Sequence, residues 1–184
     1  MLTAWGDESG SQPDADPGTY IITAVLIEDD DVAVTRKTVS SLMLPGEKKV
    51  HWHGSSDVRR RELVRAVAEL PIFGITIVHN EEGAKDRRGR RKCLEQMLPR
   101  LADFECTGFT MESRGTMDNS DLDILQKFRA RKVVDDRLRI HHARGLAEPV
   151  LAVADIVCGS VVQSRVGNPV YLDVLRTMIE VHEI

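Results

Sequence analysis

One carboxylate of the sequence lies in a segment that is otherwise almost wholly apolar. Asp155 is flanked by residues 150–154 and 156–162, a run whose length and composition predict a buried helix. An unpaired carboxylate is unfavourable in such a place, so Asp155 must be paired, protonated or bound to a metal ion. An arginine such as Arg144 or Arg165 could supply the pair, which leaves a structural ion pair and a metal ligand as alternatives.

A second acidic position closes the short apolar stretch at the start of the chain. Asp7 and Glu8 open the turn Asp-Glu-Ser-Gly, and adjacent side chains of an extended strand point to opposite faces. One of the two can therefore reach a shared cation while the other supports the loop. An Asx-type turn is the structural alternative for Asp7. A third acid, Glu112, ends a later strand, where an ordinary surface carboxylate is equally expected.

Basic residues are concentrated in one short segment. The net charge of −4 does not itself indicate nucleic-acid binding, but residues 85–92 hold six basic residues in eight. We expect a charged loop there that holds a nucleic-acid backbone without reading its sequence. Solvated helix faces are the structural alternative. The candidate contacts in this segment are Arg87, Arg88, Arg90 and Arg91.

The elements that must position these residues alternate between strands and helices. That alternation predicts an α/β fold with a mixed sheet flanked by helices. We expect strands at residues 2–6, 19–28, 72–79 and 106–112, with a turn at 10–18 and a short extended piece at 48–53. We expect helices at 31–42, 57–70, 89–101, 121–134 and 148–162.

The whole chain fits one domain of 184 residues, with a core over about 2–165 and an extension over 166–184. Three cysteines without Cys-x-x-Cys spacing disfavour a disulfide framework and a cysteine zinc site. No apolar run is long enough to span a membrane, and the first residues do not form a signal peptide, so a cytoplasmic protein is expected. The apolar tail, residues 170–184, could pack on its own core or form a homo-oligomer.

Three segments of the chain together resemble the domain-of-unknown-function 3800 family, and most closely its actinobacterial members. These are Asp-Glu-Ser-Gly at 7–10, Lys-Val-His-Trp at 49–52, and the segment 148–159 around Ala-Asp-Ile. The resemblance covers residues 2 to about 165. The family is regarded as ribonuclease H-like and as a group of candidate nucleases, so the resemblance implies that fold and that activity.

The resemblance also implies roles for particular residues. Asp7 matches a carboxylate on the first strand, Asp155 one on the last helix, and Glu112 an acidic position at the end of a later strand. His51 lies where relatives carry a lysine or histidine before an aromatic residue. A His-x-Arg-Gly segment before the last helix corresponds to His142 and Arg144. In the general ribonuclease H arrangement the strand next to the first one supplies the middle acid, which could instead nominate Glu81 or Glu82.

This residue set suits metal-dependent cleavage of a phosphodiester. Clustered carboxylates bind Mg²⁺ or Mn²⁺, and two such ions about 4 Å apart can activate water and stabilise the leaving oxygen. Asp7, Glu112 and Asp155 are the expected ligands, with Glu8 in a supporting role. Side chains expected to orient the phosphate or assist proton transfer are Lys49, His51, His142 and Arg144.

Two other functions remain open from sequence. The chain could be a catalytically inactive ribonuclease H-like module that binds nucleic acid or a partner protein. It could also be a different metal hydrolase that uses His51, His53 or His142, although no His-Glu-x-x-His pattern is present. The leading hypothesis is the nuclease acting on RNA or DNA.

Overall fold

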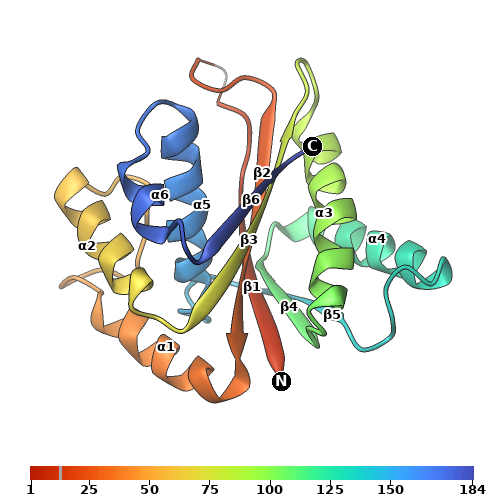
Figure 1. The fold of residues 1–184 in the computed structure, drawn as a ribbon, viewed down its shortest axis with the longest axis horizontal. Helices are drawn as coiled ribbons and strands as arrows, with labels where there is room; N and C mark the ends of the chain where they lie inside the picture. Colours follow the sequence, from red (N-terminus) through yellow and green to blue (C-terminus); the bar gives the residue numbers. More distant parts are fainter. Residues whose placement is uncertain (13) are drawn as a thin grey trace.

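Six strands form one mixed sheet in the order β5-β4-β1-β2-β3-β6 (Figure 1). The structure is a computed structural model that describes residues 1–12 and 14–184. β1 pairs antiparallel with β2 and parallel with β4, so its C-terminal end has neighbours on both sides. The strands are β1 Leu2–Ser9, β2 Thr19–Glu28, β3 Ile72–Asn80, β4 Gly108–Glu112, β5 Arg139–Ala143 and β6 Ile179–Glu183.

Helices cover both faces of this sheet (Figure 1). α1, α2, α5 and α6 lie on one face, where Trp5 and Val25 join a core that includes Val157 of α5. α3 and α4 lie on the other, where Ala4 and Ile22 pack in a second core. The helices are α1 Asp29–Ser41, α2 Asp57–Ala68, α3 Asp86–Asp103, α4 Asp118–Ala130, α5 Leu151–Arg165 and α6 Val170–Leu175, with a 3₁₀ turn at Gly115–Met117.

The basic segment differs from the expected charged loop. The helix expected at 89–101 begins three residues earlier, at Asp86, and so carries almost all of residues 85–92. Asp86 lies in the first turn, where its negative charge interacts favourably with the helix dipole. Gly89 is buried one turn later, and a Cβ there would lie 2.5 Å from the Cβ of Tyr20. The missing side chain lets α3 approach β2 closely.

The C-terminal extension packs on its own domain. Tyr171 and Leu175 of α6 are buried in the core beside α5, and β6 pairs with β3 through the register Gly74 with Ile179. The tail therefore covers its own core. None of the described helices combines the length and apolar character that crossing a bilayer requires.

Candidate active site

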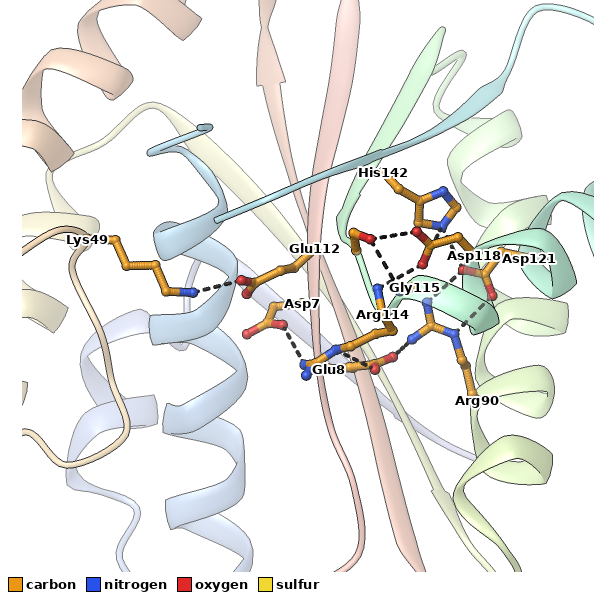
Figure 2. Close-up of polar contacts among 11 residues, drawn as sticks. Asp7, Glu8, Lys49, Arg90, Glu112, Arg114, Gly115, Asp118, Asp121 and His142 are labelled. Carbon is orange, nitrogen blue, oxygen red and sulfur yellow. Dashed lines mark hydrogen bonds and ion pairs between the residues drawn. The ribbon is translucent and has the colours of Figure 1, made fainter. Parts of the chain in front are cut away.

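A polar cleft of about 410 Å³ opens at the C-terminal end of β1. β1 contributes Asp7 to its lining, β4 contributes Glu112, and α5 contributes Asp155. The segment before α2 adds Lys49 and His51. The three carboxylates expected from sequence therefore line one cleft, together with Lys49 and His51. Figure 2 shows Asp7, Glu112 and Lys49 of this set.

The topology explains why these acids meet. β1 and β4 are parallel neighbours, and the register Gly6 with Met111 places Asp7 and Glu112 at the same edge of the sheet. α5 packs across β1, so one side of the helix faces the same edge. β3 is separated from β1 by β2, and neither Glu81 nor Glu82 lines the cleft. The alternative assignment of the middle acid to those two residues is not supported by the geometry.

Asp7 is the most strongly perturbed acid of the cleft. Its side chain is buried, and Oδ1 has no hydrogen-bond partner among the described residues. Nη2 of Arg114 approaches that oxygen only to 3.5 Å. Burial, together with the nearby Asp155 carboxylate, raises the pKa of Asp7 to about 7, although Arg114 and Lys49 act in the opposite direction. The carboxylate thus lacks the partners that a buried charge normally has.

Asp155 is held by backbone rather than by an arginine. Its Oδ2 accepts a hydrogen bond from the backbone N–H of Trp52 at 3.0 Å. Burial raises the pKa of this carboxyl group, while the Trp52 N–H lowers it. The structural alternative considered from sequence does not occur: Arg165 pairs with Asp16 at 2.6 Å, and exposed Arg144 makes no ion pair among the described residues.

Glu112 has a cationic partner inside the cleft. Nζ of Lys49 lies 2.7 Å from Oε1 of Glu112, and both side chains are about one-quarter exposed or less. Gly145 makes room for this pair, because a Cβ there would lie 2.6 Å from each of the two paired atoms. In the loop that follows β5, Gly145 therefore leaves the space that the ion pair needs. Arg144 of the same loop does not line the cleft.

Glu8 also lines the cleft and joins it to a network with residues of α3 and α4 (Figure 2). It forms an ion pair with Arg90, which is only 2% exposed, and accepts from Nε of Arg114 at 2.9 Å. Arg90 also donates to both oxygens of Asp121 on α4, at 2.9 and 2.6 Å. Nε2 of His142 lies 2.8 Å from Oδ2 of the same Asp121.

This network corrects two expectations from sequence. Arg90 is not a surface contact for nucleic acid, because both its neighbours and its burial assign it to the protein interior. His142 does not line the cleft, because its ring is engaged with Asp121. The inward orientation of Arg90 could have been found from spacing: it shares one helix face with the buried Cys93, Leu94 and Met97.

Arg114 is the functional candidate that sequence reasoning did not single out. It contacts both acids at the end of β1, Asp7 at 3.5 Å and Glu8 at 2.9 Å, and its side chain is 43% exposed. Asp118, at the start of α4, accepts a hydrogen bond from the Arg114 backbone N–H at 2.8 Å and so fixes the turn. The signal in the sequence was a basic residue two positions after Glu112, which only the fold could connect with Asp7.

The cleft has the ligand types of a divalent-cation site but is not assembled as one. Three carboxylates from three elements, one with an unsatisfied buried oxygen, are the oxygen donors that Mg²⁺ and Mn²⁺ prefer. Within residues 1–12 and 14–184, however, no three His, Cys, Asp or Glu side chains converge closely enough to hold a metal ion. Lys49 and Arg114 neutralise part of the acidic charge instead.

Comparisons with known proteins identify the fold. No family model matches the chain, and no curated protein matches it significantly. A chain of the PCNA:RNase HII complex from Archaeoglobus fulgidus has a TM-score of 0.55 at 14% identity, over 96% of this chain and 77% of its own. Ribonuclease H2 from Pyrococcus horikoshii OT3 has a TM-score of 0.53 at 12% identity, over 96% and 76%.

A third similar structure, Bst-RNase HIII in complex with Mn²⁺, has a TM-score of 0.50 at 13% identity. The match covers 95% of this chain and 54% of that one, so the chain spans about half the length of this ribonuclease HIII. The fold is therefore ribonuclease H-like, as the sequence predicted: a mixed sheet of six strands flanked by helices.

Proposed function

We propose that this protein is a divalent-metal-dependent nuclease that hydrolyses phosphodiester bonds of RNA or DNA, and that it is a member of the domain-of-unknown-function 3800 family. Asp7, Glu112 and Asp155 are the proposed metal ligands, with Mg²⁺ or Mn²⁺ as the ion. The observation that carries the proposal is Asp7, a buried carboxylate with an unsatisfied oxygen and a pKa raised to about 7 beside a second buried acid.

A bound cation would relieve the electrostatic cost of this arrangement. Burial raises the pKa values of Asp7 and Asp155, and the Asp155 charge raises that of Asp7 as well, so a shared positive ion would stabilise both acids in their charged form. The fold similarity to ribonucleases H, one of them a Mn²⁺ complex, supports the same assignment. Bound Mg²⁺ or Mn²⁺ would supply activation of water and stabilisation of the charge that develops on the phosphate.

The chain's own cations have complementary roles in this proposal. Lys49 pairs with Glu112, one of the residues that would hold the ion, and its ammonium group would be available to bind a phosphate oxygen if a cation took that carboxylate. His51 is exposed at the rim of the cleft, where it can hold or transfer a proton. Arg114 is partly exposed beside Asp7 and can bind the next phosphate of the strand.

The proposal is tested by metal titration together with a cleavage assay. Calorimetric titration with Mn²⁺ at pH 8 should show binding to the wild-type protein and strongly weakened binding to Asp7→Asn. A panel of labelled DNA, RNA and DNA/RNA hybrid substrates should be cleaved by the wild type alone. Glu81→Gln serves as the matched control, because it removes an acid outside the cleft. Equal metal binding by wild type and Asp7→Asn, with no cleavage of any substrate, would contradict the proposal.

One observation favours a second candidate, a non-catalytic module that binds nucleic acid or a protein. Several acids near the cleft already have internal partners: Glu112 has Lys49, Glu8 has Arg90, and Asp155 has the Trp52 N–H. Such pairing would let the carboxylates serve the fold alone. The same calorimetric experiment separates the two candidates, since a module of this kind would show no heat of Mn²⁺ binding while retaining oligonucleotide binding.

A further inference from the structure

A second concavity lies between α3 and α4, on the face of the sheet opposite α5. It encloses about 480 Å³ and is separate from the cleft. Its floor contains Arg90 and Asp121, which pair with each other and are both buried. Its rim is formed by exposed side chains of the two helices, and five of these are basic: Lys85, Arg87, Arg88, Arg91 and Lys127.

The rim carries more positive charge than its own neighbours neutralise. Lys85, Arg87 and Lys127 make no ion pair within 4 Å in the part of the chain that the structure describes. Arg88 pairs with Glu81 outside the groove, and Arg91 approaches Glu95 only to 3.8 Å. Asp123 is the exposed acid of the rim. The groove between α3 and α4 is therefore open, concave and cationic.

The groove and the cleft share a wall. Glu8 lines the cleft, Arg90 lines the groove, and the two side chains form an ion pair with each other. Arg114, at the mouth of the cleft, contacts Glu8 from the other side (Figure 2). The cleft and the groove are therefore adjacent, separated by the Glu8–Arg90 ion pair at the end of β1.

We propose that this groove binds the phosphate backbone of a polynucleotide whose neighbouring segment occupies the cleft. The physical basis is counterion release. Exposed arginine and lysine side chains whose charge is not neutralised by an acidic neighbour attract successive phosphates independently of base sequence. The inference rests on the proposed function, in which the substrate is a nucleic acid, and it restricts the length of that substrate. The substrate is a strand long enough to reach both sites, not a mononucleotide or a dinucleotide.

The test uses fluorescence anisotropy with single-stranded oligonucleotides in EDTA, so that neither metal binding nor cleavage enters the result. The groove variant is Arg87→Glu combined with Lys127→Glu. The control is Lys37→Glu combined with Arg65→Glu, two exposed basic residues on α1 and α2 that change the net charge equally. Thermal melting monitored by circular dichroism checks that both variants are folded.

For an oligonucleotide of about 20 nucleotides, the groove variant should bind about tenfold more weakly than wild type at about 0.1 M salt, and the slope of log K against log salt should fall by about 1.4. The control should stay within about twofold of wild type, and a tetranucleotide should bind wild type and groove variant alike. Equal losses in both double variants, or no loss in the groove variant, would overturn the inference.

The proposed function fails or succeeds by a different measurement. The groove variant should bind Mn²⁺ as the wild type does, because none of its substitutions lies in the cleft. Loss of oligonucleotide binding with no metal binding by the wild type would uphold the groove and contradict the nuclease. Metal-dependent cleavage by the wild type, with oligonucleotide binding unchanged in the groove variant, would support the nuclease and contradict the groove.

Discussion

Asp7 and Glu8 are neighbours in sequence and Arg114 contacts both, yet the rest of their surroundings differ. Glu8 faces a network in which Arg90, Arg114 and Asp121 balance one another's charges. Asp7 faces a cleft in which a second buried acid raises its pKa and its Oδ1 remains unsatisfied. One side of the strand is arranged for stability and the other tolerates an electrostatic cost, which is the arrangement expected of a functional site.

The largest expected effect comes from breaking the stable side. Arg90→Met should lower the free energy of unfolding by about 3–5 kcal/mol, because it leaves Glu8 and Asp121 buried with no shared cation. Urea denaturation at pH 7 measures the loss. Arg88→Met is the control, since its ion pair with Glu81 is exposed to solvent and should contribute little to stability. Similar effects of both substitutions would show that the network is not a structural support.

Removing the charge of Asp7, on the cleft side of the strand, should stabilise the protein. The pKa of Asp7 is raised from 3.8 to about 7 on folding, so the folded state retains a proton that the unfolded state releases. Stability therefore falls as pH rises from about 4 to 7. In EDTA, Asp7→Asn should be more stable than wild type at pH 8 by on the order of 1–4 kcal/mol, with the gain vanishing near pH 4.

Thermal and urea unfolding at several pH values check this sign. Asp16→Asn is a suitable comparison, because Arg165 lowers the pKa of Asp16 and the substitution should destabilise the protein at pH 8. A loss of stability in Asp7→Asn at pH 8 would contradict the view that Asp7 is held at an electrostatic cost.

The two histidines expected from sequence to act in catalysis should separate into the two regions. His142→Ala removes a contact to the buried Asp121 and should cost about 1–3 kcal/mol of stability. His51→Ala removes an exposed side chain at the cleft and should change stability by less than about 0.5 kcal/mol. Chemical denaturation measures both. A larger loss of stability for His51→Ala than for His142→Ala would contradict the assignment of His51 to the cleft and His142 to the network around Asp121.

A small stability effect is also expected for the cation inside the cleft. Lys49→Met breaks a partly exposed pair with Glu112 and should cost about 1 kcal/mol or less. If Lys49 competes with a metal ion for Glu112, the same substitution should tighten Mn²⁺ binding in calorimetry. Weaker Mn²⁺ binding in Lys49→Met would show that the lysine supports the metal site rather than competing with it.

The placement of Asp7 and Asp155 could be predicted from local signals, whereas their connection with Glu112 came from the family resemblance. An apolar helix with one carboxylate predicted the placement of Asp155, and a strand ending in Asp-Glu-Ser-Gly predicted that Asp7 and Glu8 would diverge. The long strands and helices were found for the same reason: their hydrophobic periodicity is clear. These features are local in sequence, and the fold determines how close the side chains lie to one another.

The features that were missed depend on contacts between distant segments. Arg90 was concealed by a run of six basic residues in which one member points inward. β5 is short and carries Arg139, His141 and His142, a composition without strand character that only pairing with β4 stabilises. β6 likewise forms at a sheet edge beside β3. Neither Arg114 nor Asp121 has a local signal, because Arg114 acquires its role from the acids of β1 and Asp121 from Arg90 and His142.

Crystals grown with Mn²⁺ offer the most direct test of the central claim that Asp7 marks a metal site. Anomalous scattering should reveal an ion contacted by carboxylate oxygens of Asp7 and Asp155, with Lys49 moved away from Glu112. No such peak in the cleft, with the Lys49–Glu112 pair intact and Asp7 still unsatisfied, would contradict it.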